Sequence, residues 1–343
     1  MPATQQTMPA IVQTVYGGPE VLYFAQVPIP ALRPHDVLVR VKAVSVNPVD
    51  TKQRAGGAPG SPVPNPPKII GWDAAGIVEA IGSAAELFAV GDAVFFAGDI
   101  TRAGSYAALV AVDERIVGRK PHSLSFEEAA AVPLVALTAW EGLLEMLDAQ
   151  KGEAGTGQRL CLVVGGGGGV GSMAIQIAKK VCNLHVIATA SRPESAAYCR
   201  QLGADHVVDH SGSLVDELTR LDMSGADYIF SAARLTNFPQ LAAALNPLGK
   251  ICCILGGDEA RRLDVSRLFP IRGTLAFEFM FARPITGIGL EKQGEILNQV
   301  ADLLDKNVLV TNMKRVLPWS AVQEAHHAIE EGHTIGKIVL HVA

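Results

Sequence analysis

Hydrophobic and polar positions alternate with a period of two through the first part of the chain. In VLVRVKAVSV (37–46), apolar and polar residues exchange sides at each position, which is typical of a β-strand. Turn residues separate several such runs, and we expect strands within 11–17, 21–36, 37–46, 76–82, 91–98 and 105–112. The stretch 56–68, dense in proline and glycine, predicts an exposed irregular loop of the kind that rims active sites. This part of the chain is therefore β-rich.

Near residue 130 the pattern changes to apolar runs that alternate with helical segments of roughly 10 to 15 residues. Helical periodicity is clear at 172–181 and 194–203. The six expected strands are 159–165, 184–190, 205–210, 227–233, 250–256 and 274–281. Strands separated by helices imply right-handed crossovers and a parallel sheet, and six strands complete a doubly wound domain.

The C-terminal part of the chain returns to the earlier pattern. After a long amphipathic helix at 291–307, strand-like segments at 310–318 and 337–343 flank a short helix at 321–332. Because this tail resembles the first domain more than the second, we expect the second domain to be an insertion. The expected division is 1–130, 131–283 and 284–343.

A run of five glycines follows the first strand of the second domain directly. Gly166, Gly168 and Gly171 have the spacing G-x-G-x-x-G, and the next segment has helical periodicity. This motif supplies a tight turn, a backbone without Cβ beside a pyrophosphate, and a helix N-terminus that attracts phosphate. Such a run also occurs in flexible loops, but here a strand and a helix flank it. The turn, with Gly169 and Val170, therefore predicts a dinucleotide site.

The residues after the second strand indicate which dinucleotide is bound. Enzymes that prefer NAD usually carry an acid about 20 residues after the turn, where it holds the ribose 2′-hydroxyl. Here the strand HVIAT runs into Ala190, Ser191 and Arg192 instead. An arginine fork pairs with two phosphate oxygens, which suits the 2′-phosphate of NADPH. Arg192 also fits an ordinary surface loop, so the assignment of NADPH depends on this residue.

Composition and charge exclude several classes of protein. The chain has 343 residues, a net charge of -5 and a pI near 6.0, without the concentrated basic face that general nucleic-acid binding needs. It has no run of about 18 apolar residues and no signal-peptide pattern. Its five cysteines form no CxxC pair, as expected of reduced core residues. We therefore expect a cytoplasmic protein that binds neither membranes nor nucleic acid.

The order of these parts resembles the medium-chain dehydrogenase/reductase superfamily, in which a Rossmann domain interrupts a GroES-like β-rich domain. The similarity is carried by the glycine turn and by the segments 43–57, 69–82, 90–107, 133–143, 189–195, 202–210, 277–283 and 336–340. The chain is most similar to the zinc-independent quinone oxidoreductases, the zeta-crystallin-like branch, and within it to a subgroup often labelled zinc-type alcohol dehydrogenase-like. This resemblance implies a homodimer.

The metal ligands of the zinc-dependent relatives are replaced in this chain. The resemblance places Asn47 where those enzymes have cysteine, and Gly71, Trp72 and Asp73 where they have Gly-His-Glu. Neither an amide nor an indole supplies the thiolate or imidazole that zinc prefers. The cysteine-rich structural zinc lobe is also missing, because no cysteine precedes Cys161. We expect no metal.

Without a Lewis acid, hydride delivery is easiest to an acceptor that is activated by its own conjugation. The sequence therefore predicts an NADPH-dependent reductase of quinones or of conjugated enones and enals. Two alternatives stay open. One is a residual alcohol or aldehyde dehydrogenase, which would contain metal. The other is a non-catalytic NADPH-binding protein, since some zeta-crystallins have become structural or RNA-associated.

The resemblance implies which residues lie at the reacting centre. Asn47 and Asp50 are expected beside the nicotinamide, where Asn47 either hydrogen-bonds a substrate oxygen or the ribose, or only forms an Asn-Pro turn. Lys52 replaces a tyrosine that many relatives carry. It is either a proton donor, a partner of the cofactor phosphates or an ordinary exposed lysine. Trp72 is expected to form an apolar wall in the former metal position.

Four further positions, Thr138, His210, Phe279 and Phe281, are implied to contact the cofactor. Thr138 matches a threonine near the nicotinamide, although it can also bond its own backbone. His210 matches a tyrosine near the 2′-phosphate, or simply ends a strand. Phe277, Phe279 and Phe281 alternate and so share one strand face, in the core, at a dimer edge or, for Phe281, near the nicotinamide. The expected cofactor contacts are Asn47, Thr138, Gly166, Gly168, Gly169, Val170, Gly171, Ser191, Arg192, His210, Phe279 and Phe281.

Overall fold

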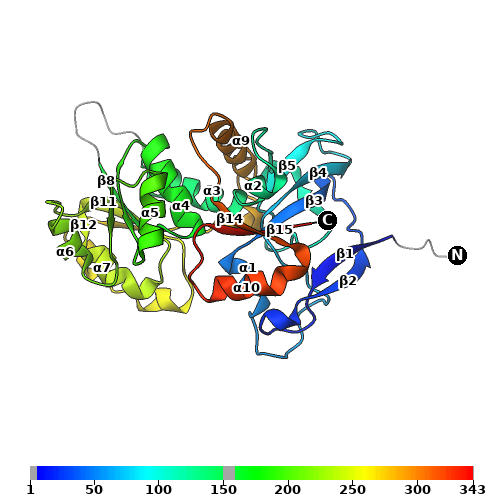
Figure 1. The fold of residues 1–343 in the computed structure, drawn as a ribbon, viewed down its shortest axis with the longest axis horizontal. Coiled ribbons are helices and arrows are strands. Elements are labelled where there is room, and N and C mark those ends of the chain that lie inside the picture. The colour runs from blue at the N-terminus through cyan, green and yellow to red at the C-terminus, as the bar shows by residue number, and fades with distance from the viewer. Residues whose placement is uncertain (1–5, 150–158, 343) are drawn as a thin grey trace. The chain divides into compact units, whose positions relative to one another are not determined.

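The computed structural model describes residues 6–149 and 159–342. The chain forms two compact units, one made of Met1–Leu134 with Phe281–Ala343 and the other of Val135–Met280 (Figure 1). The divisions after Leu134 and before Phe281 differ by a few residues from the expected ones after 130 and 283. Leu134 belongs to the first unit because its amide donates to the Asp73 carboxylate at 2.8 Å. Phe281 belongs there because its ring packs against that of Trp72.

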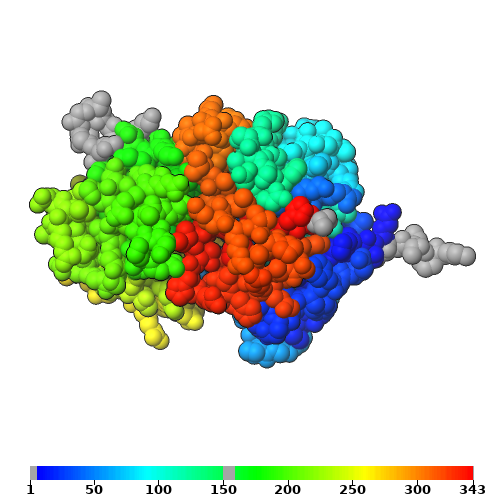
Figure 2. Space-filling view, viewed as in Figure 1, coloured from blue at the N-terminus to red at the C-terminus, as the bar shows by residue number. Residues whose placement is uncertain are grey.

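The first unit contains a seven-stranded sheet in the order β14-β15-β3-β4-β5-β7, with β6 also paired to β3. These strands are β3 (Asp36–Val46), β4 (Ala74–Ile81), β5 (Ala93–Phe96), β6 (Leu109–Asp113), β7 (Val117–Arg119), β14 (Met313–Pro318) and β15 (Lys337–His341). A separate pair joins β1 (Thr7–Val12) to β2 (Tyr23–Pro28). The tail returns to this unit as expected, because β15 pairs antiparallel with β3. Figure 2 shows the C-terminal segments, in orange and red, beside the N-terminal ones in blue.

Strand β3 is the centre of this sheet. Its alternating sequence correctly predicts a strand, but the strand is buried on both faces, and among residues 36–46 only Arg40 is exposed. The reason is that β3 pairs with β4, β6 and β15, while helix α2 (Phe126–Ala130) packs on it. Apolar residues on both faces therefore lose contact with water, which stabilises this unit.

Helices of the first unit bring distant parts of the chain together. Besides α2, this unit contains α1 (Pro48–Arg54), α8 (Ala282–Thr286), α9 (Glu291–Asp305) and α10 (Val322–Glu330). Helix α1 packs beside α10, and α9 packs on β7. The approach of α9 requires a glycine, because a Cβ on Gly294 would lie 2.7 Å from the carbonyl oxygen of Arg115.

The second unit is a doubly wound domain with a parallel sheet in the order β10-β9-β8-β11-β12-β13. Its strands are β8 (Leu160–Val164), β9 (His185–Thr189), β10 (His206–Val208), β11 (Ala226–Ser231), β12 (Leu245–Cys253) and β13 (Thr274–Phe277). Its helices are α4 (Gly169–Gln176), α5 (Pro193–Leu202), α6 (Leu214–Thr219) and α7 (Phe238–Ala243), while α3 (Pro133–Trp140) begins in the first unit. All six expected strands are present, which confirms the predicted fold class. The five cysteines are buried and unpaired, as expected.

One predicted strand ends earlier than expected. β13 stops at Phe277, and the chain turns before α8 begins at Ala282. Phe277 and Phe279 are 45% and 50% exposed, whereas Phe281 is buried at 2%. The prediction that these three rings share one strand face is therefore wrong. The aromatic residues go on alternating in the sequence after Phe277. The partner strand β12, however, ends at Cys253, which pairs with Phe277, so β13 has no strand to pair with beyond this point.

Short irregular helices complete the chain. Single 3-10 turns occur at Pro19–Val21, Glu114–Ile116, Leu235–Asn237, Asp258–Arg262, Ser266–Leu268 and Trp319–Ala321. π-helical turns extend α3 at Glu141–Met146 and α4 at Ile177–Val181. The helical stretch Phe126–Met146 is long and apolar enough to cross a membrane by length and composition alone. However, 83% of the most apolar part of this stretch is buried inside the protein, as in a core helix.

Candidate active site

The glycine turn lies between β8 and α4 in the second unit. Gly166 sits where β9, α4 and α5 converge, because a Cβ there would lie about 3 Å from atoms of Ala188, Ile175 and Cys199. A Cβ on Gly171 would lie only 2.1 Å from the carbonyl oxygen of Gly165, a distance that real Cβ atoms do not show. These two glycines are therefore required by packing of the helix against the strand.

Gly168 differs from these two glycines. A Cβ at Gly168 would meet only one atom within 4 Å, the Gly165 carbonyl oxygen, at an ordinary 3.6 Å. Packing within the unit does not demand a glycine here, but a phosphate that approached the backbone would. Gly168 is also the N-cap of α4 and has no side chain to cap the helix. The first turn of α4, with Gly169 and Val170, thus offers amide groups to an anion.

The loop after β9 lies beside this turn. Thr189, the last residue of β9, accepts a hydrogen bond at its Oγ1 atom from the Gly165 amide at 3.0 Å. Ser191 is exposed and Arg192 half-buried at the N-cap of α5. Ser195, in the first turn of α5, lies close to the glycine turn, because a Cβ on Gly167 would be 2.9 Å from the Cβ of Ser195. The turn and the arginine-bearing loop therefore lie next to each other within the second unit.

His210 follows β10, the neighbour of β9 in the sheet. The Ala190 amide donates to the Val208 carbonyl at 3.0 Å, so the two strands end together. His210 is half-buried two residues beyond that point, and its Nδ1 atom has no hydrogen-bond partner in the described part of the chain. His210 therefore lies at the carboxyl ends of the parallel strands, where ligands bind in open α/β sheets.

Three adjacent strands of the first unit bring a different cluster together at one end of these strands. β3 ends at Val46, β4 begins at Ala74 and β15 begins at Lys337, and β3 runs antiparallel to both β4 and β15. Antiparallel pairing brings the end of β3 beside the beginnings of β4 and β15. Asn47, Asp73 and Lys337 consequently meet, although they are far apart in sequence. All three are buried, at 1%, 0% and 3% exposure.

The hydrogen bonds of this cluster define its charge. The Lys337 Nζ atom donates to the Asn47 side-chain oxygen, to the Val46 carbonyl at 3.1 Å and to Asp73 Oδ2 at 3.1 Å. Three acceptors match the three N–H groups of an ammonium. Asp73 faces donors only, from Lys337, the Ser45 hydroxyl, the Asn47 amide group and the Leu134 backbone.

Burial disfavours both charges in this cluster. It lowers the pKa of Lys337 and raises the pKa of Asp73, and each shift is opposed by the attraction of the other group. We assign a charged Asp73 and a charged Lys337. A protonated Asp73 would point its O–H at one of the four groups that donate to it, and a neutral Lys337 amine would have only two N–H groups for its three acceptors.

Both N–H groups of the Asn47 side-chain amide are used within this cluster. Its nitrogen donates to Asp73 Oδ2 at 2.8 Å and to the Trp72 carbonyl at 3.1 Å, while its oxygen accepts from Lys337. These contacts leave neither N–H of the side chain for a substrate oxygen, and a role of Asn47 toward a substrate or the ribose stays a prediction. Asn47 is also the N-cap of α1.

A second buried network begins at Asp50, in the first turn of α1. Asp50 Oδ2 accepts from the Asn47 amide at 2.8 Å and from the Tyr106 hydroxyl at 3.0 Å. Tyr106 lies 3.1 Å from His326 Nε2, and Arg54 donates to His326 Nδ1 at 2.9 Å. Arginine has no acceptor, so His326 Nδ1 accepts, its Nε2–H donates to Tyr106, and the tyrosine proton points to Asp50.

This network leaves one atom unsatisfied. Asp50 Oδ1 is buried without a hydrogen-bond partner in the described part of the chain. Burial raises the pKa of Asp50 to about 7, against the opposing hydrogen bond from Asn47. Burial, together with the nearby charge of Arg54, lowers the pKa of His326 to about 3, so its ring is neutral. Burial therefore favours the protonated form of Asp50 far more than it would at an exposed aspartate.

Trp72 and Phe281 form the apolar side of this region. Trp72 is 1% exposed, and its ring meets that of Phe281 edge to face, with centroids 6.2 Å apart. The role of Trp72 as an apolar wall stays a prediction, and its indole Nε1 atom is buried without a hydrogen-bond partner in the described part of the chain. Lys52 is exposed on α1, and Thr138 is buried in α3 at 6% exposure.

The cluster at Asn47 does not fit zinc. An amide and an indole occupy two of the former ligand positions, and both Asp73 oxygens already accept hydrogen bonds, one of them from an ammonium. A metal ion here would be repelled by Lys337 and would meet one carboxylate only. Within residues 6–149 and 159–342, three or more His, Cys, Asp and Glu side chains nowhere gather as a metal site.

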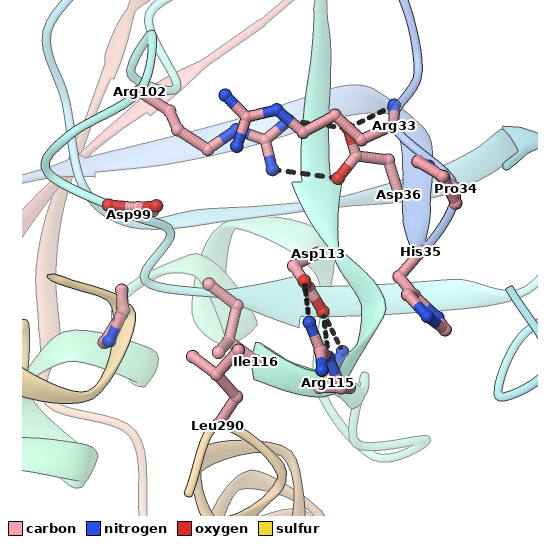
Figure 3. Close-up of a pocket in the computed structure, with 11 residues that line it drawn as sticks. Arg33, Pro34, His35, Asp36, Asp99, Arg102, Asp113, Arg115, Ile116 and Leu290 are labelled. Carbon is pink, nitrogen blue, oxygen red and sulfur yellow. Dashed lines mark hydrogen bonds and ion pairs between the residues drawn. The ribbon is translucent and has the colours of Figure 1, made fainter. Parts of the chain in front are cut away.

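A surface pocket of about 300 Å³ in the first unit contains none of these residues (Figure 3). Two of its three arginines are paired with carboxylates, Arg102 with Asp36 at 2.6 Å and Arg115 with Asp113 at 2.7 Å. Three arginines and three aspartates line it, so its charges are balanced.

Four residues of the buried networks escape prediction from the sequence: Arg54, Tyr106, His326 and Lys337. For His326 a signal exists, because Val322, Ala325 and His326 have the spacing of the buried face of an amphipathic helix. For Lys337 the only signal is a cation at the start of the apolar strand KIVLH, and lysine in such a place is ordinarily exposed.

Comparisons with known proteins agree with this architecture. Residues 33–122 match the family model of the alcohol dehydrogenase GroES-like domain, and residues 202–340 match that of a zinc-binding dehydrogenase. A zinc-type alcohol dehydrogenase-like protein of Staphylococcus aureus is 37% identical over 90% of this chain and 91% of its own length. An NADPH-dependent alkenal/one oxidoreductase of Arabidopsis thaliana is 29% identical over 97% of this chain and 79% of its own.

A solved structure from Rhizobium etli superposes closely. That protein, assigned as a zinc-dependent alcohol dehydrogenase, has a TM-score of 0.92 and 40% identity, over 99% of both chains. Both units of the fold are therefore shared with known oxidoreductases.

Proposed function

The chain belongs to the medium-chain dehydrogenase/reductase superfamily, in its zeta-crystallin-like subgroup, and from this premise we propose that it is a metal-independent NADPH-dependent reductase of conjugated enones, enals or quinones. The observation that carries the proposal is the Lys337 ammonium on Asn47 and Asp73. Members that ionise an alcohol need a Lewis acid at this position. In this chain the position already holds a protein cation.

The cofactor preference is proposed from the second unit. Bound NADPH supplies the hydride. The glycine turn with the first turn of α4 would hold its pyrophosphate, and Ser191 and Arg192 would hold the 2′-phosphate, because no acid follows β9 before α5 begins. The relative from Arabidopsis, named as NADPH-dependent, supports this preference.

The residues of the first unit support a conjugated acceptor. With no metal to polarise an isolated carbonyl, the acceptor must carry its own electron-withdrawing group in conjugation with the reacting carbon. Trp72 and Phe281 are buried against each other in this unit, and apolar surroundings of this kind would suit an unsaturated carbonyl compound or a quinone better than a polar alcohol. Asp50 is available to hold or release a proton near neutral pH.

A panel of cofactor-oxidation assays tests the proposal. Purified protein is mixed with NADPH or NADH and with short enones, enals, quinones and saturated aldehydes, each with and without chelator. We expect turnover of the conjugated acceptors with NADPH, unaffected by chelator. Oxidation of alcohols that is lost on chelation would instead show a zinc alcohol dehydrogenase. Tight NADPH binding without turnover of any acceptor would show a non-catalytic protein.

A further inference from the structure

We propose that Lys337 is a positioning residue whose buried ammonium holds the start of α1. The ammonium takes the part that a bound metal plays in zinc-dependent relatives. The inference deepens the proposed function and rests on it only for its kinetic measurement. It concerns a residue near the end of the chain that acts on residues near its beginning, through Asn47.

The contacts of Lys337 are those of a coordinated cation. Its three oxygen partners come from the last residue of β3, from the N-cap of α1 and from the residue that precedes β4. A single group thus ties together the ends of two strands and the beginning of a helix. Metal ions in proteins do the same when their ligands come from different elements.

The start of α1 is fixed by a few buried polar contacts, and that of Lys337 is the only one from an ammonium in the described part of the chain. The helix has seven residues, which is too short to be stable by itself. Its N-cap is Asn47, whose backbone amide donates to Asp50 at 2.8 Å and whose side chain is held by Lys337 on one side and Asp73 on the other. Asp50 bonds the backbone of Asn47, so the contacts that fix Asn47 at the start of α1 also fix where Asp50 lies.

A simpler role for Lys337 is to neutralise the buried Asp73. The two roles predict different behaviour when both charges are removed. If Lys337 only balances charge, the double variant Lys337→Met with Asp73→Asn regains what the single variant loses. If Lys337 also positions Asn47, the double variant regains stability but not the order of residues 45–54, because the Asn47 oxygen still lacks its donor.

The experiment compares wild type, Lys337→Met, the double variant and, as a control, Lys306→Met, which alters an exposed lysine at the end of α9. Thermal unfolding gives the midpoint, and hydrogen exchange by mass spectrometry reports the protection of residues 45–54. Exchange and kinetics are measured at the same margin below each midpoint. Lys337→Ala is measured as well, with added propylammonium or with 1-propanol of similar size.

We expect Lys337→Met to lower the midpoint by on the order of 10 °C and kcat by about ten- to a hundred-fold, with a smaller change in KM. Protection of residues 45–54 should fall, and Lys306→Met should change nothing. The double variant should recover most of the midpoint but neither protection nor kcat. Propylammonium should restore protection to Lys337→Ala, and 1-propanol should not.

Two results would overturn the inference. One is unchanged protection of residues 45–54 in Lys337→Met, and the other is recovery of both midpoint and protection in the double variant. If wild type turns over no acceptor, the proposed function fails. The exchange and rescue measurements still decide the role of Lys337 in that case, because they need no substrate.

Discussion

The glycine turn of the second unit and the buried polar core of the first unit are built in opposite ways. The turn is made of seven consecutive residues between one strand and the next helix. The polar core joins Asn47 and Asp73 to Lys337, about 290 and 264 residues away. A local motif can be recognised from consecutive residues in the sequence. The polar core, in contrast, forms only because the last strand, β15, pairs with β3, and the sequence alone does not give this strand order. The two regions therefore differ in what single substitutions do to them.

The largest expected effect is on the pH dependence of stability, through Asp50. Its pKa is raised to about 7 by burial, so the folded state binds a proton that the unfolded state releases above pH about 4. Stability contributed by the protonated form is present at low pH and is lost as pH rises toward about 7. The loss is up to about 4 kcal/mol for a shift of this size.

Asp50→Asn carries no titrating proton and should remove this slope. Urea unfolding of both proteins between pH 4 and pH 8 measures it. Parallel curves for wild type and Asp50→Asn would show that Asp50 does not titrate in this range. Such a result would also remove it as the group that exchanges a proton near neutral pH.

A matched pair of glycine substitutions probes the other region. Gly171→Ala places a Cβ 2.1 Å from a backbone oxygen and should destabilise the protein by roughly 1 to 3 kcal/mol or more. Gly168→Ala meets no close atom, so stability should change by less than about 1 kcal/mol while NADPH affinity falls by about ten-fold. Calorimetry of unfolding and of NADPH binding separates the two. Equal loss of stability in both variants would contradict the proposed division between packing and phosphate approach.

Arg192→Ala should have a smaller effect, confined to cofactor choice. Loss of one charge-assisted pair to the 2′-phosphate should weaken NADPH binding by about 1.5 to 3 kcal/mol and leave NADH binding unchanged. Dissociation constants for both cofactors measure this directly. A variant that keeps the preference for NADPH would show that another group holds the 2′-phosphate, with His210 the next residue to substitute.

The smallest expected effect is that of Lys52→Met. Because Lys52 is exposed on α1, its charge is screened by water, and kcat with a saturating enone should stay within about two-fold of wild type. A loss of kcat with unchanged KM would instead restore Lys52 as a proton donor. The measurement decides between the alternatives that its position in the sequence leaves open.

The parts of the molecule that could be predicted from sequence are those with local signals. Apolar runs and their spacing correctly predict the six parallel strands and the return of the tail, and the glycine spacing predicts the turn. The extension of the last Rossmann strand to Phe281 was wrong, because alternation continues where no partner strand remains. The roles of Arg54, Tyr106, His326 and Lys337 could not be predicted, because each depends on which distant segment packs against it.

The central claim is that a protein ammonium, and no metal, completes the polar core beside α1. Metal analysis of the purified wild-type protein, combined with its rate of NADPH oxidation by an enone before and after dialysis against chelator, tests this most directly. The account predicts zinc far below one equivalent per chain and an unchanged rate after chelation. One tightly bound zinc per chain, with activity lost on its removal and restored on its return, would contradict it.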